Sequence, residues 1–497
     1  MNPITDNQLM VNRRQFFGRS AVGIGSAALG SLLAREGLGA ASPGGLGMLP
    51  HFAPKAKRVV YLFMNGAPTH TDLFDYKPLQ KTMHGQPVPQ EFVAGKRFST
   101  MTGNPKGKLM LAPIEPFKQH GQSGAWVSNF LPHIAKAADD ICFIKSMHTT
   151  QVNHSPAVSF FLSGGEMPGR PTMGAWLSYG LGSMNENLPN YVVMHARTKH
   201  AEQSLFGRLW GSGFMSSQHQ GVLLRSQGDP VLYLNNPAGV TRQDRRAQLD
   251  TLAALNHAQH KRFADPSVLA RIKQHEMAYR MQASVPELMD LSKEPDSTFK
   301  LYGDDAKTPG TFAACCLNAR RLAERGVRNI QIFHRGWDAH GNLAGEHGNQ
   351  CKDVDQGSAA LIKDLKNRGL LEDTLIVWGG EFGRTPYCQG KLGKDNYGRD
   401  HHPRCFSIWM AGGGIKPGIT YGRTDDYGYN IADADGNMLK PQPRKDKWTP
   451  GTMHIHDLNA TILHQLGIDH RKLTYRYQGR DFRLTDVHGH VVKDILV

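Results

Sequence analysis

Acidic and histidine residues gather at the ends of three apolar runs in the second half of the chain. The three groups are Asp338 with His340, Glu381 alone, and His401 with His402. Carboxylate and imidazole groups are the usual ligands of a divalent cation. Loops at strand ends are where open α/β sheets build their sites. The pattern therefore predicts a metal-assisted hydrolase with one divalent ion.

Further candidates lie in the first half of the chain, in two polar stretches. One stretch follows the apolar run 58–64 and holds Asn65, His70 and Asp72, and the other holds His154 and Ser155. A serine beside histidines suggests a nucleophile. A Ser-Pro step is equally typical of a helix start, with the serine as N-cap. We take the cap as the minimum role of Ser155.

These side chains need strands and helices to hold them in place. Amphipathic segments alternate with short apolar runs through the second half, and this alternation predicts a mixed, mostly parallel central sheet covered by helices on both faces. The expected strands are 58–64, 140–144, 189–194, 329–333, 374–378 and 405–410. The expected helices are 313–325, 354–371 and 454–466, with a polar helical layer at 244–291.

The N-terminal sequence has the pattern of a targeting segment. Arg13 and Arg14 precede an apolar stretch at 21–33 and small residues at 39–41. This resembles a twin-arginine export signal, which implies the twin-arginine translocase as a partner and a periplasmic or extracellular location. A retained amphipathic anchor is the alternative. No later apolar run is long enough to cross a bilayer, so we expect a mature form that does not span the membrane.

The expected domain organisation follows from these segments. It consists of a signal peptide at 1–41, a linker at 42–57 and one α/β domain at 58–497, with a helical insertion near 244–310.

The formal net charge is +15, and the basic residues are scattered along the chain. No Lys/Arg block or nucleic-acid-binding motif is present in the sequence, so we expect no nucleic-acid partner. A basic balance favours anionic substrates. The six cysteines form no C-x-x-C pair, which argues against a cysteine metal site.

Four motifs together carry a resemblance to a known family. They are the segments 65–75, 336–340, 380–385 and 479–482. Over residues 58–495 the chain resembles the domain of unknown function 1501 family of exported, sulfatase-like proteins. That family in turn looks like a branch of the alkaline phosphatase and sulfatase superfamily. The resemblance implies a sulfatase-like α/β fold and metal-dependent hydrolysis of sulfate or phosphate esters.

The resemblance also implies roles for individual residues. It implies one divalent ion (Ca, Zn or Mg) held by Asp338, His340, His402 and Glu381, with Glu381 as ligand or base. Asn65 takes the place of an aspartate ligand, and Asp72 is a possible substitute for the missing charge. His154 stands where sulfatases carry the modified cysteine. The anion pocket would comprise His154, Arg384 and His70, with Asn65, Ser155 and His401 in contact with substrate.

Departures from the pattern leave three functions open. No cysteine begins a C-x-P-x-R motif, so the formylglycine mechanism is not available. The first function is a hydrolase acting on an anionic small-molecule or polysaccharide ester. The second is a non-catalytic polysaccharide- or anion-binding protein, favoured by Asn65 and Phe382 at ligand positions. The third is a phosphatase or phosphodiesterase that uses Ser155 or a threonine as nucleophile.

Overall fold

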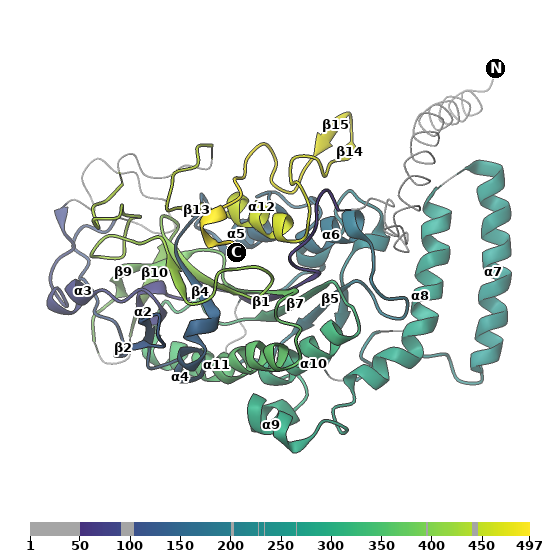
Figure 1. Cartoon of the computed structure of the whole chain (residues 1–497), viewed down its shortest axis with the longest axis horizontal. Helices are drawn as coiled ribbons and strands as arrows, with labels where there is room; N and C mark the ends of the chain where they lie inside the picture. Colours follow the sequence, from purple (N-terminus) through teal and green to yellow (C-terminus); the bar gives the residue numbers. More distant parts are fainter. Residues whose placement is uncertain are drawn as a thin grey trace.

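A central sheet dominates the computed structural model of the chain (Figure 1). The structure describes residues 50–90, 104–199, 203–226, 228–232, 234–264, 266–393, 396–439 and 446–497. The sheet contains, in spatial order, β12 (Ile419–Tyr421), β4 (Ile141–His148), β11 (Phe406–Ala411), β8 (Thr374–Gly379), β1 (Arg58–Met64), β7 (Asn329–His334), β5 (Tyr191–His195) and β6 (Val222–Leu224), and β13 (Met453–His454) pairs with β4.

The strand directions match the expected fold class. β1 runs parallel to both of its neighbours, β7 and β8, and β5 runs parallel to β7 and β6. Among the described strands of this sheet, β11 alone runs antiparallel to its neighbours, β8 and β4. The expected mixed, mostly parallel sheet is therefore confirmed.

Helices cover both faces of this sheet (Figure 1). One face carries α10 (Phe312–Glu324) and α11 (Leu343–Asn367), and the other carries α5 (His154–Ser163), α6 (Met173–Leu181) and α12 (Ile455–Gln465). All of β1 is buried, and its residues alternate between the two cores. Leu62 joins the core with α10 and α11, whereas Phe63 joins the core with α5, α6 and α12. A strand buried on both sides reads as a continuous apolar run, which is how 58–64 appears in the sequence.

A separate two-stranded ribbon lies where we expected only loops. β9 (Gly383–Gly390) and β10 (Tyr397–His402) pair antiparallel, with an irregular register between Arg399 and His401. Neighbouring residues on a strand point to opposite faces. His401 and His402 are therefore sent in different directions, and this determines which of them reaches the site.

Several further elements are short. They are β2 (Phe117–His120), β3 (Ala125–Ser128), β14 (Tyr475–Tyr477), β15 (Arg480–Phe482), α2 (His70–Leu73), α3 (Pro78–Thr82), α4 (Pro132–Lys136) and α9 (Asp296–Tyr302). All six cysteines are buried and free of disulfides. Two of them, Cys315 and Cys316, belong to α10 and face the core, which leaves them a packing role.

Two long helices form a hairpin at one side of the molecule (Figure 1). α7 (Arg242–Phe263) begins with a capping box, in which Thr241 and Asp244 satisfy each other's backbone N–H groups. α8 (Pro266–Met289) returns along it toward the sheet. These helices occupy the segment that we expected to be helical. α11 begins earlier than expected, at Leu343 rather than 354.

The expected signal segment, residues 1–41, lies outside the described residues, as does the first half of the expected linker, 42–49. Within the described ranges, no helix combines the length and the apolar character needed to traverse a bilayer.

Candidate metal centre

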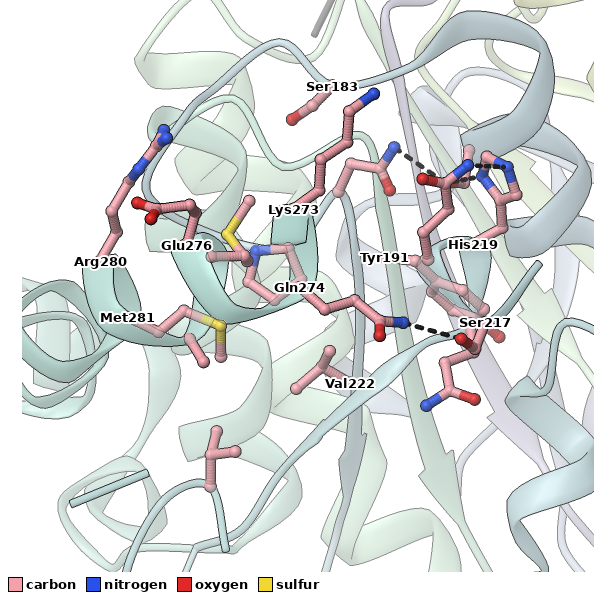
Figure 2. A pocket seen from close by; sticks show the side chains of 18 of the residues that line it. Ser183, Tyr191, Ser217, His219, Val222, Lys273, Gln274, Glu276, Arg280 and Met281 are labelled. Atoms are coloured by element: carbon pink, nitrogen blue, oxygen red, sulfur yellow. Dashed lines mark hydrogen bonds between the residues drawn. The ribbon is translucent and has the colours of Figure 1, made fainter. Parts of the chain in front are cut away.

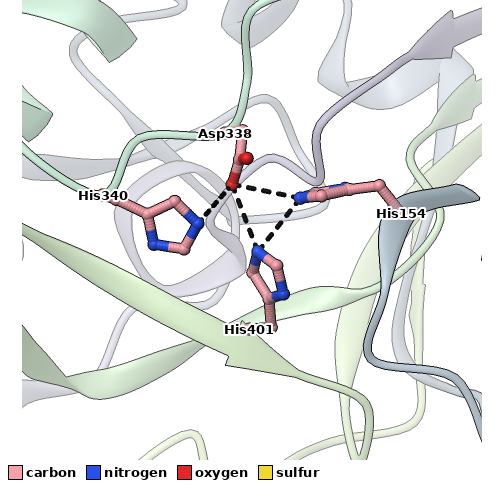
Figure 3. Close-up of side chains that lie close together, drawn as sticks. All are labelled: His154, Asp338, His340 and His401. Atoms are coloured by element: carbon pink, nitrogen blue, oxygen red, sulfur yellow. Dashed lines mark hydrogen bonds and ion pairs between the residues drawn. The ribbon is translucent and has the colours of Figure 1, made fainter. Parts of the chain in front are cut away.

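Four side chains from distant parts of the chain meet at one point (Figure 3). His154 begins α5, Asp338 and His340 lie in the loop after β7, and His401 lies on β10. Asp338 Oδ1 is 3.1 Å from Nε2 of His154, 2.8 Å from Nε2 of His340 and 3.2 Å from Nε2 of His401. The Nε2 atoms of His154 and His401 are 3.0 Å apart. All three imidazoles thus present the same nitrogen to one carboxylate oxygen.

The outward-facing nitrogens of two of these rings meet acceptors. His401 Nδ1 lies 2.7 Å from the carbonyl oxygen of Val152, which can only accept a hydrogen bond. The ring must therefore donate from Nδ1. His154 Nδ1 lies 2.6 Å from Oε1 of Glu381 and donates to this carboxylate in the same way. This arrangement of outer acceptors fixes the tautomer of metal-binding histidines and turns the Nε2 lone pair toward the ion.

The third ring follows the same pattern. His340 Nδ1 is hydrogen-bonded to the side-chain oxygen of Gln389, and its Nε2 faces Asp338. The side chain of His340 is 37% exposed, whereas that of His401 is 3% exposed. The cluster is therefore open to solvent on the His340 side.

The groups around Asp338 keep its carboxylate in the charged form. Burial raises the pKa of Asp338, but its contacts with the three histidines and with Arg384 outweigh burial and hold that pKa far below its usual value. Burial lowers the pKa of His401 to about 4, so this ring is neutral. Burial also lowers the pKa of His154, but its bonds to Asp338 and Glu381 outweigh burial and raise it.

A proton on His154 satisfies only part of this arrangement. It lies between Asp338 and the lone pair of His401, but it does not reach His340 Nε2, which also faces Asp338. A cation at the centre satisfies all four groups together. Tetrahedral coordination with bonds of about 2.0–2.1 Å separates neighbouring ligand atoms by about 3.3 Å. Four of the six separations between ligand atoms are 2.8–3.2 Å, close to this value, and all four atoms lie within 4.8 Å of one another, so the donor set fits a metal ion after a small adjustment of His340.

Two further side chains hold Asp338. Arg384 is almost fully buried, and its guanidinium donates to Asp338 Oδ1 at 2.7 Å and to the Ala67 carbonyl at 2.9 Å. Gln203 Nε2 donates to the other oxygen, Oδ2, at 2.7 Å. With both oxygens engaged, the carboxylate is fixed with Oδ1 toward the imidazoles. Arg384 has its donors committed inside the protein, and it lies here as a support for Asp338 rather than as a wall of an open anion pocket.

The structure places two of the expected metal ligands elsewhere. His402 Nε2 bonds the Tyr429 carbonyl at 2.6 Å, on the opposite face of β10 from His401. Asp72 is fully buried and pairs with Arg399 at 2.6 Å. Glu381, also expected as a ligand or base, is fully buried and lies behind His154, outside the group of four side chains. Its carboxylate accepts hydrogen bonds from His154 Nδ1 and from the Gly66 N–H.

The expected substrate-contacting residues are dispersed. His70 is buried, and its Nε2 bonds the Gly428 carbonyl at 2.9 Å. Asn65 is also buried and donates to the Gln203 carbonyl at 3.1 Å, beside the cluster. His401, expected to touch substrate, belongs to the cluster itself, as does His154.

Ser155 differs from its expected local role. α5 begins at His154 with Asn153 as its N-cap residue, so Ser155 is the second residue of the helix and not its cap. The helix starts one residue earlier than the Ser-Pro step suggested. The exposed Ser155 hydroxyl instead accepts a hydrogen bond from Arg208 at 2.6 Å.

A family model matches most of the chain. The family is described as "Protein of unknown function (DUF1501)", and the match covers residues 56–496. The expected family is confirmed. None of the curated proteins gives a significant match.

Several solved structures share a weak likeness to the chain. The crystal structure of Ps i-CgsB in complex with k-i-k-neocarrahexaose has 10% identity and a TM-score of 0.34, over 83% of this chain and 72% of that one. A protein in the alkaline phosphatase superfamily from Vibrio parahaemolyticus has 10% identity and a TM-score of 0.33, over 84% and 68%. Alkaline phosphatase from the Antarctic bacterium TAB5 has 11% identity and a TM-score of 0.31, over 74% and 94%. Likenesses this weak carry no information about activity.

Proposed function

This chain belongs to the DUF1501 family, and from its site we propose that it is an exported, metal-dependent hydrolase of sulfate or phosphate esters. Export rests on the twin-arginine pattern of the N-terminal sequence. The twin-arginine translocase is the partner that this pattern requires.

One observation carries the proposal. Three imidazole Nε2 atoms surround a single carboxylate oxygen, while acceptors engage the outer nitrogens of all three rings. Buried or half-buried polar groups need partners, and a proton on His154 does not reach Nε2 of His340, so the four groups do not all satisfy one another. Histidines that serve only a structural role have no need of three outer acceptors oriented in this way.

The ligand set also favours a class of metal. Three nitrogen ligands and one oxygen suit Zn²⁺ or a related transition-metal ion. Ca²⁺ and Mg²⁺ prefer sites built almost entirely from oxygen. We therefore narrow the expected ion from calcium, zinc or magnesium to zinc or a related transition metal, held by His154, Asp338, His340 and His401.

The residues around the centre would each have a distinct role in catalysis. Because the four side chains complete a tetrahedral set, such an ion, when bound, would polarise an ester oxygen or activate water only by accepting it as a further ligand. Glu381 orients His154, and Arg384 and Gln203 together orient Asp338. Each ligand that faces the centre is thus held before substrate arrives, which is the preorganisation that catalytic sites need.

The open side of the cluster indicates where an ester would bind. His340 is the most exposed of the four ligands, and the exposed Arg208 lies over the Ser155 hydroxyl next to His154. A guanidinium in that position suits a sulfate or phosphate group, which it can bind through two parallel hydrogen bonds. If the protein is a phosphatase that uses a serine nucleophile, Ser155 is the residue in position to serve as it.

A substrate screen on metal-loaded protein tests the activity. We expect turnover of an aryl sulfate, an aryl phosphate or a bis-aryl phosphate, and its loss in His340→Ala. Retained turnover in Ser155→Ala assigns the attack to water, whereas loss of turnover with normal metal content assigns it to Ser155. Protein that binds metal stoichiometrically but turns over none of the three esters contradicts the hydrolase and favours the non-catalytic anion-binding protein.

Gln203 provides a second test of the same site. Its backbone has a φ of 64°, a left-handed conformation that is costly for a residue other than glycine. We expect Gln203→Ala to weaken metal binding by about 10- to 100-fold, as loss of a supporting hydrogen bond typically does. Competition with a fluorescent chelator measures this change. Gln389→Ala, which removes the acceptor of His340, is the matched comparison, and unchanged affinity in both variants would show that the outer hydrogen bonds do not position the ligands.

A further inference from the structure

A cavity of about 710 Å³ lies at the β6 end of the sheet (Figure 2). It is lined by residues of α6, of β6 and of α8, the inner helix of the hairpin. None of the four side chains of the metal centre lines it. Pockets that bind small organic molecules span roughly 300–1,000 Å³. The cavity therefore has the size of a binding site in its own right.

Most of the wall is apolar and flexible. Met277 and Met281 from α8 face Val222 from β6, and Val231 and Leu234 close the wall. Methionine side chains adapt to ligands of varied shape, because they have several rotatable bonds and a polarizable sulfur. This part of the cavity suits a hydrocarbon chain.

The inner end of the cavity is polar but carries no negative charge. The Ser178 hydroxyl lies 2.9 Å from His219 Nδ1 and accepts a hydrogen bond from Asn190 at 3.2 Å. Burial, together with the nearby positive charge of Lys273, lowers the pKa of His219 to about 4, so its ring is neutral. The end offers hydrogen bonds to a polar group without repelling an anion.

Two carboxylates, of Glu186 and Glu276, and two cations, of Lys273 and Arg280, line the cavity, so their formal charges balance. The Glu276 carboxylate is bound by Arg246, from outside the lining, through two hydrogen bonds at 2.6 and 2.9 Å. Arg280 donates to the Glu186 carbonyl at 2.9 Å and lies 3.9 Å from the Glu186 carboxylate. Both carboxylates therefore have an arginine beside them. Lys273 has no ion pair among the residues that the structure describes, and Figure 2 shows its ammonium extended away from Glu276, toward Ser183. An unpaired ammonium beside an apolar wall favours an anionic head group.

We propose that this cavity binds a single-chain anionic amphiphile, with its carboxylate at Lys273 and its hydrocarbon chain among Met277, Met281 and Leu234. Charge selects the head group and burial of apolar surface selects the chain, so neither half of the ligand suffices alone. The proposal is independent of the metal centre, since the two sites share no residue.

Calorimetric titration of the full chain with dodecanoate, below its micelle concentration, tests the proposal. We expect saturable binding of one molecule per chain. Butanoate has the same head group without the long chain, and dodecyltrimethylammonium has the same chain with the opposite charge, so we expect no saturable binding of either. Binding of all three with similar strength, or binding of dodecanoate to many equivalent weak sites, would overturn the proposal.

Two variants locate the site. Lys273→Met removes the charge and should weaken dodecanoate binding at least about 10-fold, whereas Lys261→Met, on the exposed face of the outer helix α7, should leave it unchanged. Met277→Trp fills the cavity and should abolish binding, with circular dichroism as the check on folding. Undiminished binding in Lys273→Met refutes the head-group assignment. Undiminished binding in a folded Met277→Trp protein refutes the cavity.

Discussion

Replacing His401 by glutamine is expected to weaken metal binding by more than about 100-fold. Changes to groups that merely support a ligand cost about 10- to 100-fold, so loss of a direct ligand costs more. His401 Nε2 lies 3.2 Å from Asp338 Oδ1 and 3.0 Å from His154 Nε2, within the proposed ligand set. Isothermal titration with Zn²⁺ or Co²⁺ measures the affinity directly.

The neighbouring residue supplies the control. His402 is as buried as His401 but bonds the Tyr429 carbonyl on the other face of β10. Glutamine at 402 can still donate to that carbonyl, so His402→Gln should bind metal as the unchanged protein does. If His402→Gln loses the metal and His401→Gln retains it, the ligand set is the one expected from the family resemblance and not the one assigned here.

Removing the carboxylate of Asp72 is expected to destabilise the fold by about 3–5 kcal/mol, because it leaves the charge of Arg399 buried without its partner. Both side chains are fully buried, and two hydrogen bonds, at 2.6 and 3.0 Å, join them. The pKa of Asp72 supports this pairing: burial raises it, but Arg399 outweighs burial and lowers it. Denaturant unfolding of Asp72→Ala, followed by tryptophan fluorescence, measures the loss.

A solvent-exposed ion pair provides the control for this experiment. Arg476 and Asp481 are 3.1 Å apart on the β14–β15 hairpin, and both side chains are more than half exposed. Solvent-exposed ion pairs contribute little to stability, so Asp481→Ala should unfold close to the unchanged protein. Equal effects of Asp72→Ala and Asp481→Ala would show that the buried pair is not a determinant of the fold.

Much of the sheet was predictable from local sequence. Strands such as β1 and β8 are buried on both faces, and they appear as uninterrupted apolar runs between turn residues. The β9–β10 ribbon was missed because it is rich in charged and polar residues, such as Arg384, Arg399 and Asp400, whose burial depends on partners far away in the chain.

The site was predictable only where its residues are close in sequence. The D-x-H spacing of Asp338 and His340 places both at one loop, and the structure brings both to the cluster. The choice between His401 and His402 depends on which face of β10 each occupies, and the irregular pairing beside Arg399 sets this register. Strand alternation offered a signal that only one of the two histidines faces the centre, but not which one. Gln203 carried no signal at all, because its role depends on the loop conformation that brings it to Asp338.

The metal content of purified protein tests the central claim most directly. The protein would be stripped with a chelator, reloaded with an equimolar mixture of Zn²⁺, Ca²⁺ and Mg²⁺, desalted and measured by elemental analysis. We expect one zinc ion per chain in the unchanged protein and in His402→Gln, and none in His401→Gln or Asp338→Ala. Equal zinc content in all four proteins, or no retained metal in any of them, would contradict it.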